Sequence, residues 1–361
     1  MRRPSTFFFL FLCSFFVTTP ASSDTGSDQG VARVMVVHSY GSNHVCGKPQ
    51  GDGVAQALAD AGWKQGKNLE LRSVYMDTKK TYTTPEAIHE RGKEALAAIE
   101  AFNPQVVVVL DDNAIREVLL PLVDRKGISL VFSGMNGQPA DYSKKAKFLE
   151  SLAKPGHNVT GVYEKLYLLK SMRVMAAAIG NLKPGDKVVG ITDYSPTGNA
   201  ITRQFEIELA GHTPKLGWEL RRVKDFEDYK ALINSLNQNP HVRAIYPAAL
   251  KLKTADGQTY IADQIFAWTI EHSAKPEMAL NYYFSKIGLF GGAAVDFTAM
   301  GYQAGKMAAR ILSGTKAGDI SIEDASDYAI VFNQKRAKSL GIDIPKPLLT
   351  AADQVYKSDD K

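Results

Sequence analysis

The feature that most constrains this chain is a repeated alternation of short apolar runs with helical segments. Residues 31–37 and Val106–Leu110 are short, β-branched runs followed by turn-forming or polar residues, which is typical of buried strands. Pro85–Phe102 lies between two such runs and has helical spacing, with a proline suited to a first turn. This alternation predicts a mainly parallel sheet with helices on both faces.

The pattern restarts after residue 161 and continues to the C-terminus. We predict strands at residues 31–37, 69–75, 106–110, 128–132, 187–191, 218–223, 242–246, 289–295 and 328–332. We predict helices at residues 53–61, 85–102, 112–123, 166–179, 198–209, 225–236, 296–312 and 334–340. Gly301, Gly305 and Ala309 share one face of the helix 296–312, which indicates close packing there. A chain of 361 residues exceeds what a single core supports, so we expect two α/β lobes.

The N-terminus has the features of a secretory signal. Two arginines precede an apolar run at residues 7–17, and small residues follow it, so we predict a cleaved signal peptide at residues 1–23. A buried N-terminal helix is a poor alternative, because apolar residues cover every face of the run. The run is also too short to span a bilayer. Cys13 falls within the signal, which leaves Cys46 without an intramolecular disulfide partner. We therefore expect a free, exported protein.

Motifs of catalysis and of nucleic-acid binding are absent from the sequence. It has no nucleophile elbow, zinc-binding His-Glu-x-x-His, phosphate loop or dinucleotide fingerprint. The net charge of +5 is mild and forms no basic block, so we expect no nucleic-acid partner. Two minor alternatives remain open: His38 and His44 with Cys46 as metal ligands, and Asp111 with Asp112 as a catalytic pair. Adjacent aspartates after a strand usually diverge, and one of them caps the next helix. We predict no enzyme activity and no cofactor.

Binding features are better supported, because polar residues follow several predicted strands. In open α/β sheets, ligands bind beyond the carboxyl ends of the strands. Acidic side chains there suit a ligand ammonium, tyrosines suit an apolar or ring-bearing part, and helix N-termini suit a carboxylate. For each residue, a role as a helix cap or turn is an equally good interpretation. The candidate ligand-binding residues are Ser39, Tyr40, Asp112, Asn113, Gly134, Met135, Asn136, Glu164, Ser195, Asn199, Tyr246, Pro247 and Asn281.

Three segments carry a family resemblance. Residues 157–162 read His-Asn-Val-Thr-Gly-Val, and residues 291–297 read Gly-Gly-Ala-Ala-Val-Asp-Phe. Residues 333–353 contain Leu-Gly-Ile, Ile-Pro, Leu-Leu and Ala-Asp at characteristic intervals. In this order they resemble the ABC transporter substrate-binding protein family, which includes TrpX-like tryptophan-binding proteins. The resemblance covers nearly all of residues 31–356, and its C-terminal part is the most specific.

The resemblance implies a type I periplasmic-binding-protein fold. Such a fold has two Rossmann-like lobes with parallel sheets, joined by a hinge of three crossovers. We expect an N-terminal lobe at 31–161 plus 285–325 and a C-terminal lobe at 162–284 plus 326–356. The crossovers are expected near residues 160–164, 281–286 and 326–332.

The resemblance also implies a function. The protein would be a periplasmic monomer of an ABC importer, which captures a small solute between its lobes by hinge closure. The solute would be an amino acid or a related amine or carboxylate compound. An ABC permease of the inner membrane would be the transient partner. As an alternative, the closed form would be delivered to a receptor kinase in a sensory system.

This chain departs from the family pattern at several expected pocket positions. Residues 111–114 read Asp-Asp-Asn-Ala where relatives carry a Thr-Pro-Ala-Ala-like turn, and residues 134–137 read Gly-Met-Asn-Gly where relatives tend to carry Thr-Asp-Pro. Glu164 stands near a usual Asp, and Ser195 and Asn199 fall where relatives place Asn and Ser. These departures leave the scaffold intact but do not support specificity for aromatic amino acids. The extra acidic side chain favours a cationic or amine-bearing solute.

Overall fold

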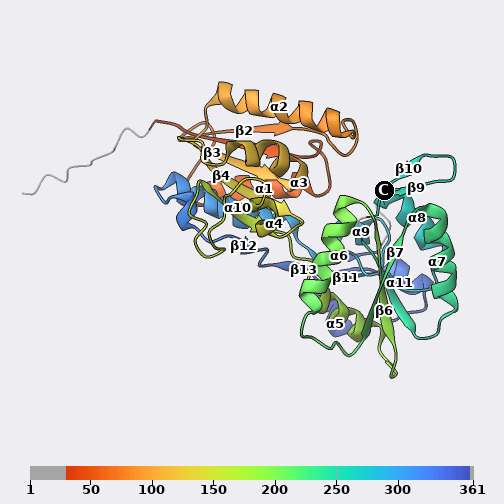
Figure 1. Cartoon of the computed structure of the whole chain (residues 1–361). Helices are drawn as coiled ribbons and strands as arrows, with labels where there is room; N and C mark the ends of the chain where they lie inside the picture. The colour runs from red at the N-terminus through yellow and green to blue at the C-terminus, as the bar shows by residue number, and fades with distance from the viewer. Residues whose placement is uncertain (1–29, 249, 358–361) are drawn as a thin grey trace, which may run out of the picture. The chain divides into compact units, whose positions relative to one another are not determined.

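A six-stranded sheet in one lobe and two three-stranded sheets in the other form the framework of the protein (Figure 1). The computed structural model describes residues 30–248 and 250–357. The predicted signal peptide at 1–23 lies outside these residues. Within them, no helix combines the length and the hydrophobicity needed to cross a membrane.

The first sheet contains six parallel strands in the order β12–β5–β4–β3–β1–β2. β3 is apolar throughout and buried on both faces. Its alternate residues contact opposite cores, with Val106 and Val108 on one face and Val107 and Val109 on the other. The strands are β1 (Ala32–His38), β2 (Leu69–Tyr75), β3 (Val106–Leu110), β4 (Ser129–Met135), β5 (Val159–Tyr163) and β12 (Glu323–Asp324).

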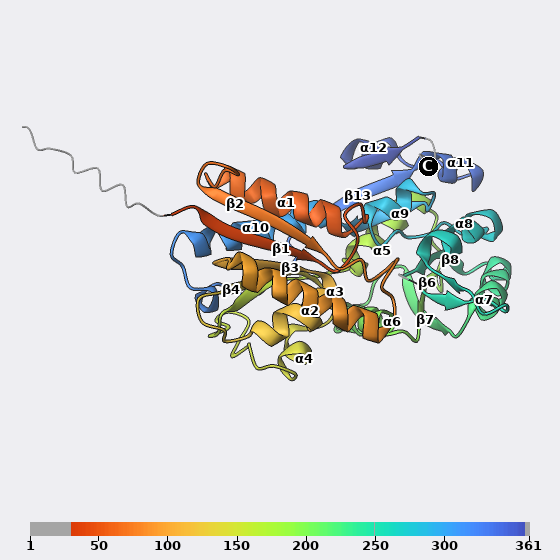
Figure 2. The same ribbon diagram turned by 90° about the horizontal axis from the view of Figure 1, so that it is seen from above.

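Helices cover both faces of this sheet, with α1 and α10 on one face and α2 on the other (Figure 2). α1 and α10 pack closely because glycines face each other. A Cβ on Gly301 would lie 2.0 Å from the Gln50 carbonyl oxygen, and one on Gly53 would lie 2.2 Å from that of Thr298. This confirms the predicted packing role of the small residues. The helical segments are α1 (Gly47–Asp60), α2 (Pro85–Phe102), α3 (Asp111–Ala114), a π-helix (Ile115–Leu119), 3-10 turns (Leu120–Leu122 and Ala317–Asp319), α4 (Pro139–Ser143) and α10 (Phe297–Leu312).

The second lobe is built on two three-stranded sheets, β7–β6–β8 and β11–β13–β14. Isolated bridges of Ile245 with Glu277 and of Met278 with Gly291 link them. β11 runs antiparallel to β13, an exception to the expected parallel arrangement. The elements are β6 (Lys187–Asp193), β7 (Gly217–Val223), β8 (Val242–Pro247), β11 (Gly291–Val295), β13 (Tyr328–Asn333), β14 (Gln354–Tyr356), the hairpin β9 (Leu252–Lys253) and β10 (Thr259–Tyr260), α5 (Leu168–Ile179), α6 (Pro196–Leu209), α7 (Phe226–Gln238), α8 (Ala262–His272), α9 (Tyr282–Lys286), α11 (Gln334–Ser339) and α12 (Lys346–Ala351).

The chain passes three times between the two sets of strands. It leaves the first sheet after β5, returns between β11 and α10, and leaves again between β12 and β13. The second crossover predicted at 281–286 is wrong, because these residues form the cap and body of α9, which packs against β11 and β13. β11 therefore lies in the second lobe, whereas the prediction placed residues from 285 onward in the N-terminal lobe.

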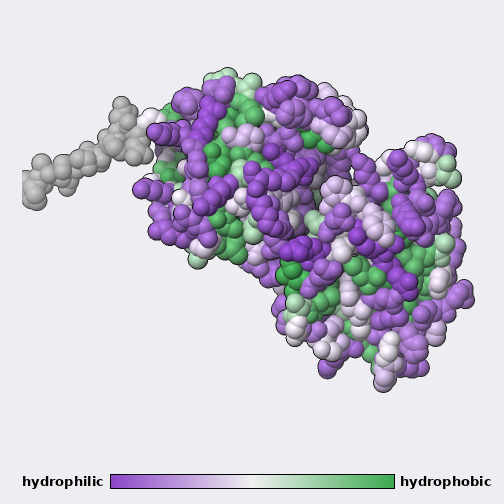
Figure 3. Space-filling model, viewed as in Figure 1, coloured by the Kyte–Doolittle hydropathy of each residue, from purple (hydrophilic) through white to green (hydrophobic). Residues whose placement is uncertain are grey.

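Few large hydrophobic side chains reach the surface. The face shown in Figure 3 is mostly hydrophilic, with hydrophobic residues in small patches. Among the described residues, the exposed large hydrophobic side chains are Val31, Tyr82, Leu152, Tyr194 and Ile207. The polar groups at the strand ends are therefore the main source of distinctive chemistry in this fold.

Candidate functional site

Polar residues that follow four strands of the first sheet meet at its carboxyl edge. The register pairs His38 with Leu110, Leu110 with Ser133, and Met135 with Tyr163. The residues after these strands are therefore neighbours, because parallel strands end at the same edge. The structure thus brings together the first-lobe candidates, which are Ser39, Tyr40, Asp112, Asn113, Gly134, Met135, Asn136 and Glu164.

Ser39 has a structural role at this edge. Its hydroxyl lies 2.7 Å from the Leu110 carbonyl oxygen and accepts a hydrogen bond from the Ala114 amide at 2.8 Å. Ser39 thereby satisfies an amide in the first turn after β3. The prediction that one of the two aspartates caps this helix is wrong, because the Ser39 hydroxyl occupies that position.

Asp112 orders the loop that follows β4. Its carboxyl accepts hydrogen bonds from the Asn136 amide at 3.2 Å, the Asn136 side chain at 2.9 Å and the Tyr142 hydroxyl at 2.5 Å. Asn113, the next residue, donates to the Thr78 hydroxyl at 2.7 Å. Asp112, Asn113 and Asn136 therefore already have protein partners, which limits what they can offer a ligand.

Asp111 is the more distinctive of the two aspartates. It adopts a left-handed backbone conformation (φ +66°) and is only 3% exposed. The Gln50 side-chain amide donates to its Oδ1 at 3.0 Å, and the Ser133 hydroxyl donates to Gln50 Oε1 at 2.8 Å. Its Oδ2 is buried and has no hydrogen-bond partner among the described residues. Gly134, at φ +74°, permits this approach, because a Cβ there would lie 2.7 Å from Asp111 Oδ1.

Glu164 is the second buried acid at this edge. Its backbone amide donates to the Met135 carbonyl at 2.8 Å, which fixes the residue directly after β5. The side chain is 5% exposed, and no described residue donates a hydrogen bond to its carboxyl group. A buried carboxyl without a donor is costly to ionise.

The electrostatics of the edge follow from this burial. Burial raises the pKa of Glu164 to about 8, and the charges of Asp111 and Asp112 add to the shift while Lys79 opposes it. Burial likewise raises the pKa of Asp111 to about 7, against the hydrogen bond from Gln50. At neutral pH, Glu164 is therefore mostly protonated, and Asp111 is divided between its protonated and ionised forms.

Tyr40 forms an aromatic wall beside these acids. Its ring lies 4.2 Å from the His44 ring and 5.1 Å from the Lys79 ammonium. His44 accepts a hydrogen bond from the Cys46 amide at 3.2 Å, and burial lowers the pKa of His44 to about 3. His44 is therefore neutral. No group of three or more His, Cys, Asp or Glu residues in the described part of the chain is arranged to hold a metal ion.

Three of the five second-lobe candidates have structural roles. Ser195 caps α6 by accepting from the Gly198 amide at 3.1 Å, and Asn281 caps α9 by accepting from the Phe284 amide at 3.0 Å. Asn199 accepts a hydrogen bond from Arg222 at 2.5 Å. Tyr246 and Pro247 end β8, and the Tyr246 hydroxyl is buried without a described partner. Burial raises the pKa of Tyr246, and the charges of Glu208 and Glu164 add to the shift.

A cavity of about 250 Å³ joins candidates from both lobes. Asn136 and Asn199 both line it, together with residues of α4 and α6. At this position the Gln138 side chain donates to that of Gln204 at 2.9 Å. Asn136 and Asn199 are thus the pair of predicted residues that a shared cavity brings together.

Sequence reasoning missed several groups at this edge. Asp111 was recognised only as a possible catalytic partner of Asp112, and Lys79 and Gln50 were not considered. Gln50 lies on α1 and Lys79 after β2, so only the parallel strand order brings them to Asp111. The rule that ligands bind beyond the carboxyl ends of parallel strands, which we call the strand-end rule, could have found Lys79, since Lys79 lies shortly after the end of β2. No local signal marks Gln50.

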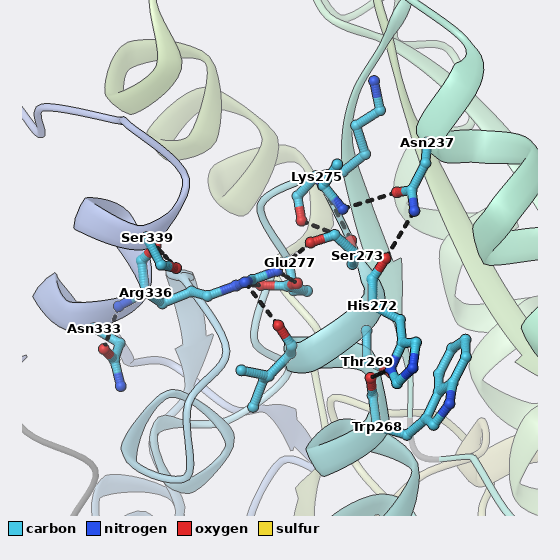
Figure 4. Close-up of polar contacts among 12 residues, drawn as sticks. Asn237, Trp268, Thr269, His272, Ser273, Lys275, Glu277, Asn333, Arg336 and Ser339 are labelled. Atoms are coloured by element: carbon cyan, nitrogen blue, oxygen red, sulfur yellow. Dashed lines mark hydrogen bonds and ion pairs between the residues drawn. The ribbon is translucent and has the colours of Figure 1, made fainter.

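A second buried charged cluster lies away from this edge, between α8 and α11 (Figure 4). The Arg336 guanidinium donates to Glu277 Oε2 at 3.0 Å, to the Ile270 carbonyl at 2.9 Å and to the Ser273 carbonyl at 2.8 Å. It also forms an ion pair with the other oxygen of Glu277. Both side chains are buried, and their charges and polar atoms are used within the protein.

Comparison with known families identifies the protein class. A family described as ABC transporter substrate binding protein matches residues 43–356. The chain belongs to this family. A tyrosine-binding protein from Clostridioides difficile (strain R20291) is 20% identical over 292 residues, which cover 80% of this chain and 75% of that protein.

Two solved structures share the fold of this chain. A protein from Streptococcus pneumonia in complex with L-Trp is 21% identical, with a TM-score of 0.65 over 90% of this chain and 99% of the other. A ligand-free, open substrate-binding protein with adhesive properties from Clostridium difficile is 15% identical, with a TM-score of 0.67 over 91% and 100%. These likenesses confirm the predicted two-lobed α/β fold class of periplasmic solute-binding proteins.

Proposed function

We propose that the chain is the exported binding protein of an ABC importer and captures a small amine-bearing solute, an amino acid or a related compound. It acts in the periplasm as a monomer, needs no cofactor and performs no catalysis. A permease in the inner membrane receives the solute. The predicted lobes belong to this proposal, with β11 moved to the second lobe.

The observation that carries the proposal is the set of buried polar atoms without partners. Asp111 Oδ2 in the first lobe and the Tyr246 hydroxyl in the second are buried without a described partner, and no described residue donates a hydrogen bond to the carboxyl of Glu164, a first-lobe residue that is 5% exposed. Buried polar groups in proteins are almost always hydrogen-bonded, so exceptions require an explanation. A solute with N–H donors and a polar acceptor would satisfy all three groups.

Hinge closure follows from binding between two lobes. A solute that contacts both lobes binds the closed form better than the open form and shifts the population toward it. The three crossovers after β5, before α10 and before β13 are the segments where the backbone can turn. The permease then distinguishes the loaded form by its shape.

Small-angle X-ray scattering of the mature chain tests this proposal. We expect the radius of gyration to decrease when a bound compound from a broad library of amino acids and amines is added. Thermal stability should rise with the same compound, since a ligand that binds only the folded state stabilises it. A library without any binder, or a binder that leaves the scattering unchanged, would contradict capture by hinge closure.

A further inference from the structure

The buried acids at the strand edge allow the solute class to be narrowed, and this step rests on the proposed function. We propose that the site takes an organic cation with a net positive charge, whose ammonium or guanidinium group is held by Asp111 and Glu164 and replaces a proton there on binding. Capture of the solute is thus coupled to proton release.

The balance of charge at the site favours a cation. Asp111, Asp112 and Glu164 contribute three carboxyls, and Lys79 contributes the opposing cation. A solute without a charged N–H donor would leave the ionised forms of Asp111 and Glu164 without a charged partner, which is unfavourable in a buried site. A charged N–H donor gives each of them a charge-assisted hydrogen bond.

The geometry favours an organic cation over a metal ion. Asp112 already accepts three hydrogen bonds, so only Asp111 and Glu164 have oxygens to spare. The described acids do not form a group of three that could hold one metal ion. An ammonium or guanidinium group differs from a metal because its N–H donors point in several directions at hydrogen-bond distance and can be shared between two carboxyls.

The Tyr40 ring supports the same assignment. Aromatic faces attract cations, and this ring already has the Lys79 ammonium 5.1 Å from its centre. A Cβ on Gly47 would lie 3.9 Å from Asp111 Oδ2 and 3.9 Å from a carbon of the Tyr40 ring, so the ring lies near the unpartnered oxygen. A cation between Asp111 and Glu164 would therefore be close to an aromatic surface as well.

Proton release follows from the groups that face Glu164. The groups coupled to it by charge are Asp111 and Asp112 after β3, Lys79 after β2, Tyr40 and Cys46 before α1, and Tyr246 on β8. Burial and the charges of the two aspartates raise the pKa of Glu164 to about 8, so the ligand-free site holds a proton on Glu164 below that pH. A bound cation stabilises the ionised form and expels that proton. The affinity for the cation should therefore rise with pH between 6 and 8.

Isothermal titration calorimetry of the mature chain tests the inference with 4-aminobutylguanidine, 1,5-diaminopentane and L-tyrosine as probes. We expect at least one of the two cations to bind tenfold or more tightly than L-tyrosine, and its affinity to increase about tenfold from pH 6 to pH 8. The binding heat should differ between two buffers of different ionisation enthalpy, because the buffer takes up the proton that the protein releases.

Glu164→Gln is the decisive variant, and exposed Glu271→Gln on α8 is its matched control. Glu164→Gln should abolish the pH dependence and weaken cation binding at least tenfold, whereas Glu271→Gln should change neither. Tighter binding of L-tyrosine with a decrease in the radius of gyration would overturn the cation assignment and leave the proposed function intact. Failure of all three probes to bind would also overturn the cation assignment, and the library scattering experiment would then decide the proposed function separately.

Discussion

Glu164 and Glu277 are both buried glutamates, yet their surroundings differ in kind. Glu277 accepts hydrogen bonds from Nε and Nη2 of Arg336. The same guanidinium also donates to the backbone carbonyls of Ile270 and Ser273. Glu164 has two acidic neighbours and no hydrogen-bond donor among the described residues. A buried charge with every partner supplied by the protein is part of the framework. A buried ionisable group without partners points to a ligand.

The largest expected effect comes from breaking the satisfied pair. Arg336→Met should lower the free energy of unfolding by about 3–5 kcal/mol, because it leaves Glu277 buried without its partner. Urea denaturation measures this change. The control is Arg221→Met, which removes an exposed pair with Glu219 and should cost less than about 1 kcal/mol. Equal effects of the two substitutions would show that the Arg336 cluster is not a structural element.

The next effect concerns the glycine beside Asp111. Gly134→Ala should destabilise the protein by about 2–3 kcal/mol, because it adds backbone strain at φ +74° and places a Cβ 2.7 Å from Asp111 Oδ1. Gly127→Ala is the matched control, with φ +81° and nothing within 4 Å of the added Cβ. It should cost only the strain, about 1 kcal/mol. If thermal denaturation gives the same loss for both, Asp111 is not held as described.

A smaller effect, of opposite sign, is expected at Glu164. In the folded chain Asp111 and Glu164 keep their protons to about pH 7 and 8, whereas the unfolded chain loses them near pH 4. The folded state binds more protons between these limits, so the stability of the ligand-free protein should fall as the pH rises from about 4 to 8.

Glu164→Gln removes part of this pH dependence. The variant should be close to the parent protein at pH 5 and exceed it by at least about 1 kcal/mol at pH 8, because the amide avoids the cost of a buried charge. Urea denaturation at the two pH values measures both differences. Loss of stability at pH 8 would mean that the Glu164 carboxylate has stabilising partners.

The smallest effect is expected from two buried tyrosine hydroxyls. The Tyr246 hydroxyl has no described partner, whereas that of Tyr229 shares a hydrogen bond of 2.6 Å with Thr269. Tyr229→Phe should cost about 1 kcal/mol, and Tyr246→Phe should cost about 0 kcal/mol. Thermal denaturation of the two variants side by side would reveal any hidden partner of Tyr246 as an equal loss.

Helices and strands were predictable from the sequence where neighbouring residues alone determine the element. β3 and α2 were predicted to the residue, because β3 is a pure apolar run and Thr84 and Pro85 mark the start of α2. The helix predicted at 112–123 is instead α3, a π-helix and a 3-10 turn, which begins at the left-handed Asp111 and contains Pro121. α8 was not predicted, since only Ile265, Phe266 and Thr269 are buried along it.

The site was only partly predictable for a related reason. The strand-end rule located Asp112 and Glu164, because it depends on position in the chain. It could not separate roles, since Ser39 and Ser195 are as polar as any ligand-binding residue yet serve as caps. Asp111 was not predicted as a ligand-binding residue, because a positive φ in a non-glycine residue cannot be recognised from the sequence.

Native mass spectrometry of the protein purified from the cells that express it tests the central claim most directly. The parent protein and Glu164→Gln would be compared for the small compound that each carries through purification. We predict that the parent protein retains a cationic compound and that Glu164→Gln has lost it while remaining folded. The same compound retained equally by both proteins would contradict the claim that the unpartnered buried acids form the binding site.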